Sequence, residues 1–256
     1  FAQINELIKV IDDAVWGLPL ICLIMVTGIL LTVRLGGVQV RHLGKAFKFM
    51  FQDEEDGHGE VTSFGALCTA LSATIGTGNI AGVATAIAAG GPGALFWMVV
   101  AAFFGMATKY SEGLLAIKYR TIDQDGHVLG GPFYYIENGM GKKWKWLAKI
   151  FAFFGAGVGL FGIGTFTQVN SIASAVKNFF DPDMAHTVTV LGNDYSIATV
   201  IAGILLTVFV GLVVIGGIKR ISKVSEVVVP FMAVLYVVLC LIIVFTNIKA
   251  VPGSIC

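Results

Sequence analysis

The chain has 256 residues, of which 56% are hydrophobic and only 13% are charged. A soluble domain carries about 25% charged residues, so this composition excludes a soluble protein and predicts an all-α integral membrane protein. The net charge of +1 does not by itself argue for or against a nucleic-acid partner, but we expect none because the basic residues lie in loops between apolar segments.

Six apolar segments are close to the roughly 20 residues that a helix needs to cross a bilayer. They cover about residues 14–33, 63–89, 94–119, 146–176, 197–218 and 224–246. An amphipathic stretch over residues 4–15 precedes the first segment and suits the membrane interface. No Asp, Glu, Lys or Arg occurs from Val61 to Thr108, and Gly90-Gly-Pro-Gly93 divides this stretch into the second and third segments.

The positions of the basic residues support this division. Four of the 17 Lys and Arg residues follow the first segment, seven lie around the connection between the third and fourth, and three follow the fifth. The other three are Lys9, Lys177 and Lys249, on the opposite side. Because cytoplasmic loops carry excess Lys and Arg, the pattern predicts a multi-pass protein of the cell (plasma) membrane, with cytoplasmic basic loops and both ends of this chain outside.

Three connecting segments have a recognisable character. Gln52–Gly57 is acidic and is expected to be solvated, and Asp181-Pro-Asp183 is expected to start a turn on the outer side. Gly130–Glu137 combines a turn signal with aromatic residues, which favours a helix or hairpin at the cytoplasmic face. The cysteines show neither CxxC nor Cys/His spacing, so no zinc site or disulfide framework is predicted.

The second segment contains the polar run Ser72-Ala-Thr-Ile-Gly-Thr-Gly-Asn79 near its middle. Such a run makes a poor lipid-facing helix, and irregular backbone survives at membrane depth only where it lines a cavity or a ligand site. We therefore predict a discontinuous helix over residues 63–89 that unwinds from Ser72 to Asn79.

Two interpretations of this break remain open. In the first, freed carbonyls coordinate a cation, and the N–H groups near Gly78 and Asn79 hold an anionic carboxylate. Thr74, Thr77 and Asn79 would add neutral oxygens, which suit Na⁺. In the second, the glycines only allow close helix packing.

The fourth segment places Gly164, Gln168 and Ser171 on one helix face, at spacings i, i+4 and i+7. A glutamine deep in a span is costly unless it has a partner. Either Gly164 leaves room for a substrate that Gln168 binds, or Gln168 makes an interhelical hydrogen bond within a close-packed interface. The sequence does not separate these two hypotheses.

The sequence lacks ionisable residues near the centres of its apolar segments and lacks known catalytic motifs, and both absences bear on the function. No ionisable residue lies near the centre of any segment, which does not support coupling through a buried carboxylate and favours Na⁺. Lys109 and Glu112, spaced i, i+3, are expected to form a local ion pair. There is no nucleophile elbow, phosphate-binding loop or zinc-protease motif, so we expect neither an enzyme nor an organic cofactor.

Three blocks carry a resemblance to the alanine/glycine:cation symporter family. They are Thr74–Thr85, Gly90–Trp97 and Gly131–Glu137. The step Gly76-Thr-Gly-Asn79 is also similar to the distantly related neurotransmitter:sodium symporters. The resemblance implies a leucine-transporter-like fold of the APC superfamily, in which two five-helix inverted repeats enclose a central site.

The resemblance also implies a domain organisation. Residues 1–62 would form the interfacial segment, one extra transmembrane helix and a loop. Residues 63–256 would form the first five-helix repeat, and the second repeat would be absent from this chain.

By the same resemblance, the site lies between the broken helix, the fourth segment and the missing repeat. The implied substrate-binding residues are Thr74, Gly76, Thr77, Gly78, Asn79, Gly164 and Gln168. The implied sodium ligands are Ser72 and Ile75 through their carbonyls, with Thr74 and Asn79 near a second ion.

The resulting interpretation is sodium-coupled symport of small neutral amino acids (alanine or glycine) by alternating access. Its partners are the amino acid, Na⁺, membrane lipid and the missing repeat. One alternative is a half-transporter that acts as a homodimer, and another is an assembly subunit without a ligand. Because one wall of the site is missing, we expect this polypeptide alone not to transport.

Overall fold

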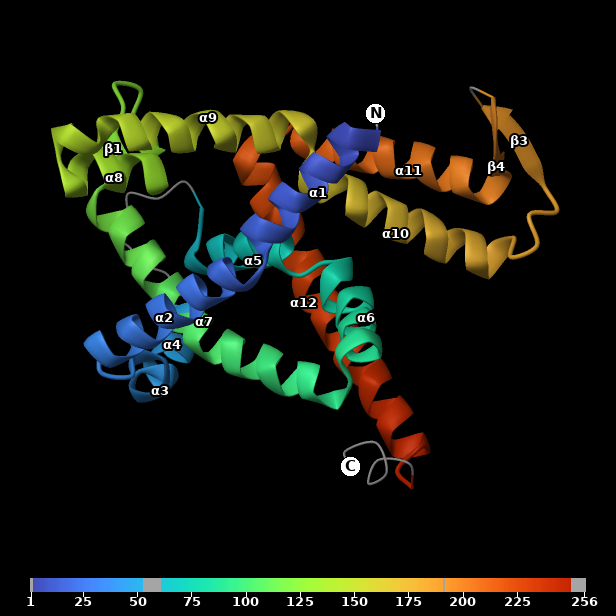
Figure 1. Ribbon diagram of the computed structural model, residues 1–256, viewed down its shortest axis with the longest axis horizontal. Coiled ribbons are helices and arrows are strands. Elements are labelled where there is room, and N and C mark those ends of the chain that lie inside the picture. The colour runs from blue at the N-terminus through green and yellow to red at the C-terminus, as the bar shows by residue number, and fades with distance from the viewer. Residues whose placement is uncertain (1, 53–60, 191, 250–256) are drawn as a thin grey trace. The chain divides into compact units, whose positions relative to one another are not determined.

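The computed structural model describes residues 2–52, 61–190 and 192–249, and these are mainly helical (Figure 1). The predicted acidic loop Gln52–Gly57 falls mostly outside the described residues. In chain order the elements are α1 (Ala2–Trp16), α2 (Leu18–Arg34), α3 (Val38–Arg41), α4 (Leu43–Met50), α5 (Ser63–Thr74), the 3₁₀ turn η1 (Thr77–Asn79), α6 (Ala81–Gly90), α7 (Pro92–Lys118), β1 (Thr121–Ile122), β2 (Val128–Leu129), α8 (Pro132–Met140), the 3₁₀ turn η2 (Lys142–Trp144), α9 (Lys145–Phe161), α10 (Ile163–Phe180), β3 (Thr187–Val190), β4 (Asn193–Ser196), α11 (Ile197–Val214) and α12 (Gly217–Thr246).

The prediction of an all-α membrane protein with six spans is confirmed. Five helical stretches of the described chain are long and apolar enough to cross a membrane, and the bent pair α5 and α6 makes a sixth. The predicted division at Gly90-Gly-Pro-Gly93 is also found, because α6 ends at Gly90 and α7 begins at Pro92. Gly91 between them has φ 68°, a value that favours glycine.

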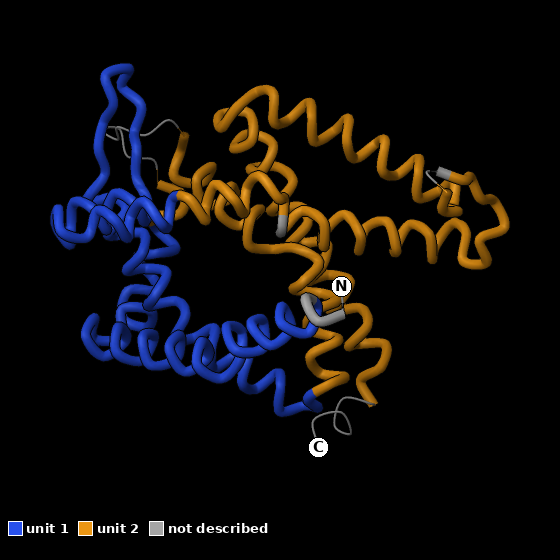
Figure 2. The backbone as a smooth tube through the Cα atoms, turned by 45° about the horizontal axis from the view of Figure 1, so that its top comes forward, with its two compact units in different colours: residues 1–48, 90–152 blue, residues 49–89, 153–256 orange. Residues whose placement is uncertain are grey.

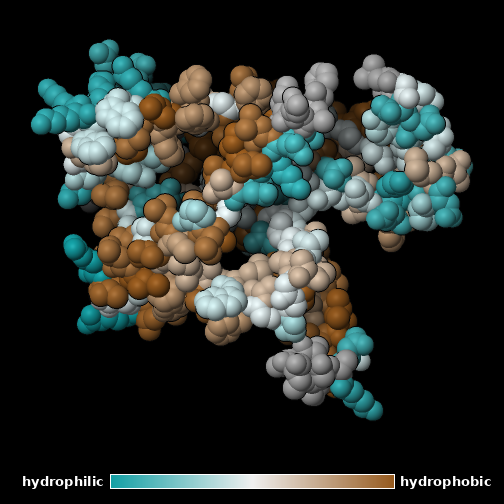
Figure 3. All heavy atoms as spheres, viewed as in Figure 1, coloured by the Kyte–Doolittle hydropathy of each residue, from teal (hydrophilic) through white to brown (hydrophobic). Residues whose placement is uncertain are grey.

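Hydrophobic side chains lie on the outside of these helices (Figure 3). Leu160 and Ile215 are 84% and 85% exposed. Each such side chain gains about 1.5–3 kcal/mol when it leaves water, so lipid is the environment that this surface fits. The chain is a multi-pass membrane protein.

The chain forms two compact units, shown in different colours in Figure 2. The first contains residues 1–48 and 90–152, and the second contains residues 49–89 and 153–256. The division predicted after residue 62 concerns the repeats of the family and not these compact units, so it stays a prediction.

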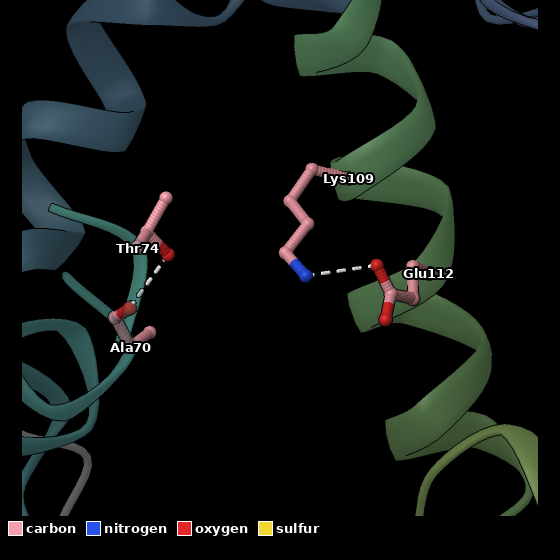
Figure 4. Close-up of polar contacts among 4 residues, drawn as sticks. All are labelled: Ala70, Thr74, Lys109 and Glu112. Atoms are coloured by element: carbon pink, nitrogen blue, oxygen red, sulfur yellow. Dashed lines mark hydrogen bonds and ion pairs between the residues drawn. The ribbon is translucent and has the colours of Figure 1, made fainter. Parts of the chain in front are cut away.

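In the first unit, α2 packs against α7. Gly28 permits this close contact, since a Cβ there would lie 2.9 Å from the Phe104 Cβ. The expected ion pair between Lys109 and Glu112 is present in α7, with Nζ and Oε2 2.9 Å apart (Figure 4). A short hairpin, β1–β2, leads into α8, so the aromatic block after Gly131 forms a helix.

In the second unit, α5 packs against α12, and α10 packs against both α11 and the turn η1. An antiparallel hairpin joins α10 to α11, with Thr187 of β3 opposite Ser196 of β4. This hairpin follows the predicted turn after Asp181 but was not itself predicted.

The fourth predicted span is found as one apolar stretch, Lys142–Phe180, in which Gly162 interrupts the helix between α9 and α10. Gly162 adopts φ 58° and ψ 34° between α9 and α10. This left-handed conformation carries a steric cost for other residues, so the glycine-rich stretch around it permits the interruption. All three residues of the predicted polar face, Gly164, Gln168 and Ser171, lie in α10.

Candidate functional site

The second predicted span is broken near its middle. Helix α5 ends at Thr74, Ile75 and Gly76 are extended, and η1 then leads into α6. The two halves are bent by 68°, which confirms the predicted discontinuous helix over residues 63–89. The predicted unwinding from Ser72 starts three residues too early, because Ser72 to Thr74 remain helical.

Hydrogen bonds inside the break explain why the helix stops there. The Gly76 N–H donates to Asn79 Oδ1 at 3.0 Å, and the Asn79 N–H donates to the Gly76 carbonyl at 3.1 Å. Glycine is also a poor helix former. The reciprocal pair therefore stabilises a tight turn in place of another turn of α5.

The end of α5 presents backbone carbonyls that have no donor. The Ile75 N–H bonds to the Leu71 carbonyl at 2.7 Å, but the N–H groups of Gly76 and Thr77 bond to side chains instead. Within the described residues, the last three carbonyls of α5 and that of Ile75 accept no hydrogen bond. They lie at the negative end of the α5 dipole, an arrangement suited to a hard cation that prefers oxygen ligands.

The start of α6 presents the opposite polarity. Its first i→i−4 bond runs from the Ala84 N–H to the Ile80 carbonyl, at 3.2 Å. In the part of the chain that the structure describes, the N–H groups of Gly78 and of the three residues that open α6 have no acceptor. These donors lie at the positive end of a helix of ten residues, where an anionic group is stabilised.

Two hydroxyls at the end of α5 bond back along their own helix. Ser72 Oγ donates to the Thr69 carbonyl at 2.7 Å, and Thr74 Oγ1 donates to the Ala70 carbonyl at 2.8 Å (Figure 4). A hydroxyl that donates its proton still has lone pairs to offer. Thr74 can therefore act as an oxygen ligand without a change of rotamer.

Gln168 of α10 contacts the break directly. Its Oε1 accepts hydrogen bonds from the N–H and the Oγ1 of Thr77, each at 2.8 Å. A Cβ at Gly76 would overlap the Gln168 amide, so the glycine is needed for this close approach. Of the two interpretations of Gln168, the structure contains the interhelical hydrogen bond.

Two other predicted site residues, Gly78 and Gly164, lie close in sequence to Thr77 and Gln168, and the structure leaves open space beside each of them. Gly164 precedes Gln168 by one turn of α10, and Gly78 lies inside η1. Among the described residues, nothing lies within 4 Å of a Cβ built at either glycine. The structure thus joins Gly76, Thr77 and Gln168 by contact, and leaves open space at Gly78 and Gly164.

Sequence reasoning missed the residues that fix the far end of α5. Thr62 caps the helix, since its Oγ1 accepts from the Gly65 N–H at 3.0 Å and donates to Glu226 Oε1 of α12 at 3.0 Å. A threonine just before an apolar run is a recognised start signal and could have been used. Nothing in the sequence pointed to Glu226 as its partner.

A membrane protein with a discontinuous span, whose two half-helices offer carbonyls and N–H groups at the same point, fits the class of secondary transporters. The sequence matches the sodium:alanine symporter family over residues 1–256. The chain belongs to this family, as the sequence blocks predicted.

Individual relatives agree with this assignment. An uncharacterized transporter of Haemophilus influenzae is 50% identical over 252 residues, which are 98% of this chain and 52% of the relative. The sodium/alanine symporter AgcS of Methanococcus maripaludis is 47% identical, over 95% of this chain and 51% of the relative. The probable sodium/glutamine symporter GlnT of Bacillus subtilis is 34% identical, over 98% and 48%. The chain spans about half the length of these curated relatives.

Proposed function

We propose that this chain forms one half of the substrate pathway of a sodium-coupled symporter for small neutral amino acids, with alanine as the first candidate and glycine as the next. The observation that carries the proposal is the break in the second span, where carbonyls and N–H groups that have no partner among the described residues meet. The name of the Methanococcus maripaludis relative, a sodium/alanine symporter, supports alanine.

Sodium is assigned to the end of α5. In the part of the chain that the structure describes, the carbonyls of Ser72 and Ile75 have no donor, and the side-chain oxygens of Thr74 and Asn79 lie on the same short segment. All of these ligands are neutral, so no carboxylate of the chain would cancel the positive charge of the bound ion. Na⁺ would therefore add a positive charge that attracts the carboxylate of the substrate.

The amino acid is assigned to the start of η1 and α6. Its carboxylate would accept from the N–H groups of Thr77 and Gly78 and from the hydroxyl of Thr77. Gly164 and Gln168 would form the wall contributed by α10, and the open space at Gly164 suits a small side chain. Because Na⁺ and the carboxylate attract each other across the break, binding of one favours binding of the other.

Alternating access would then carry both to the other side, driven by the inward Na⁺ gradient. In this scheme residues 63–256 act as the first repeat, the complementary repeat supplies the opposite wall, and the basic loops face the cytoplasm. Labelling of single cysteines in these loops with an impermeant reagent tests the orientation. Labelling of the Lys142–Lys149 region from outside intact cells would contradict it.

The decisive experiment measures [¹⁴C]alanine uptake by the full-length protein in proteoliposomes with ²²Na⁺ outside. We expect alanine uptake and ²²Na⁺ entry to rise together, and both to be lost when Asn79 is changed to Ala. Replacement of Na⁺ by choline provides the control for coupling. Alanine uptake that is equal in choline would overturn the sodium coupling, and no uptake in either medium would overturn alanine as the substrate.

A further inference from the structure

The double hydrogen bond on Gln168 has the form of a bound ligand. One oxygen, Gln168 Oε1, accepts from both the N–H and the hydroxyl of Thr77 at 2.8 Å. The two residues are 91 positions apart in the sequence, and the contact joins α10 to η1 within the second unit. Backbone N–H and hydroxyl donors that converge on one oxygen also form the usual cradle of a carboxylate.

We propose that Gln168 is a self-ligand: its amide oxygen occupies the donors of Thr77 in the empty site, and the carboxylate of the amino acid must displace it to bind. The proposal rests on the proposed function and deepens it. It changes the role of Gln168 from a residue that attracts the substrate to one that competes with it.

The geometry makes Thr77 the point of competition. The neighbouring N–H of Gly76 is already bonded to Asn79 Oδ1 at 3.0 Å, so it is not available without opening the turn. The missing side chain at Gly76 lets the Gln168 amide lie directly over the break. A carboxylate that enters at this position therefore meets the same two donors that Gln168 holds.

The chemistry explains how displacement selects a substrate. Hydrogen bonds to a carboxylate are roughly twice as strong as those to a neutral acceptor. An amino-acid carboxylate can therefore replace the amide oxygen, whereas a neutral ester or amide gains nothing by the exchange. The self-ligand also satisfies the Thr77 N–H while the site is empty, which avoids an unpaired donor at membrane depth.

If Gln168 is a self-ligand, its replacement changes the affinity for alanine in the opposite direction from that expected of a direct substrate ligand. If Gln168 competes, removal of its acceptor frees Thr77 and tightens alanine binding. If Gln168 binds the substrate or only holds α10 in place, its removal weakens binding or leaves it unchanged. A gain in affinity cannot come from a damaged fold.

The test uses the full-length protein in detergent with saturating Na⁺, and measures the Kd for [³H]alanine. Gln168→Met keeps the length of the side chain but removes the amide oxygen. We expect its Kd to fall at least about two- to tenfold, because one net hydrogen bond is worth about that factor in an equilibrium constant and Gln168 Oε1 accepts two. Gln168→Glu places a charged competitor on Thr77, and we expect its Kd to rise by about tenfold or more.

Gln39→Met is the matched control, because Gln39 also bonds a threonine, with its Nε2 3.0 Å from Thr32 Oγ1, but lies in the first unit. We expect the Kd of this variant to equal that of the wild type. Gln168→Ala covers the case in which Met does not fit, and it should also bind more tightly. If wild-type protein binds alanine while Gln168→Met and Gln168→Ala bind equally or more weakly, the self-ligand is overturned. If the wild type binds no alanine, the proposed function fails first.

Discussion

Gly76 is the residue of the break over which the Gln168 amide of α10 lies. Any side chain there would overlap the Gln168 amide, and crowding in a packed site costs typically about 1–3 kcal/mol. We predict that Gly76→Ala displaces Gln168 and distorts the turn, so that sodium-dependent alanine uptake by the full-length protein falls by about tenfold or more. Gly203→Ala is the control, because a Cβ built there meets no described atom within 4 Å apart from its neighbours in the chain and the backbone of its own helix. Equal uptake by Gly76→Ala and wild type would show that the close approach is not required.

Asp181 lies in the loop after α10, and its hydrogen bonds lead to a second prediction. Its carboxylate accepts from Ser196 Oγ at 2.6 Å and from the Ala185 N–H at 2.8 Å. The bond from Ser196, together with those from the backbone, holds the pKa of Asp181 below its ordinary value. A lowered pKa stabilises the folded hairpin at pH values above the ordinary range of an aspartate, and this contribution is lost as the pH falls through the folded value.

We therefore expect the β3–β4 hairpin to be well protected from hydrogen exchange at pH 7 and to lose that protection below about pH 4. Asp181→Asn should already be less protected at pH 7, and the difference from wild type should shrink at pH 3. Asp183→Asn, at an exposed position of the same loop, should match the wild type at each pH. A constant difference between Asp181→Asn and wild type at both pH values would contradict the assignment.

At the scale of elements, the contact between α5 and α12 fixes the first half of the broken span. A Cβ at Gly65 would overlap Glu226 Oε1 and Ser222 Oγ and would lie 2.9 Å from Thr62 Oγ1. We predict that Gly65→Ala destabilises the protein by about 1–3 kcal/mol, through overpacking and the weakened cap. The buried thiol of Cys68 lies one turn along α5 and offers the measurement, as its rate of maleimide labelling should rise. Gly211→Ala in α11, where a Cβ meets nothing within 4 Å in the described chain, should not raise it.

The helix boundaries show which structural features could be predicted from the sequence and which could not. The boundary at Gly90-Gly-Pro-Gly93 and the broken span were predictable, because glycine, proline and polar runs act locally on the backbone. The end of α5 was misplaced, since it depends on the bonds of Asn79 and Gln168 to the residues after it. The interruption at Gly162 could not be singled out from the other glycines nearby. That Gln168 needs a partner followed from its depth in a span, but the partner, Thr77, is set by tertiary packing.

At the scale of the whole molecule, the described part of the chain leaves the polar face of the break uncovered. Thr74, Gly78 and Asn79 are exposed in this chain, and the backbone beside them contains carbonyls and N–H groups without partners among the described residues. Exposure of such groups to hydrocarbon costs several kcal/mol each. The break therefore requires a second polar surface, and the relatives, about twice as long as this chain, have the length to provide one.

We accordingly predict that residues 1–256 alone do not transport. Proteoliposomes that contain only this polypeptide should take up [¹⁴C]alanine at the rate of empty liposomes, with or without a Na⁺ gradient, whereas the full-length protein should concentrate it. Co-reconstitution of this polypeptide with the remainder of the full-length protein should restore part of the uptake, because the two halves would then cover the break from both sides. Sodium-dependent uptake by the polypeptide alone would contradict the prediction. In that case, crosslinking would be expected to trap a homodimer, in which a second copy of the break supplies the opposite wall.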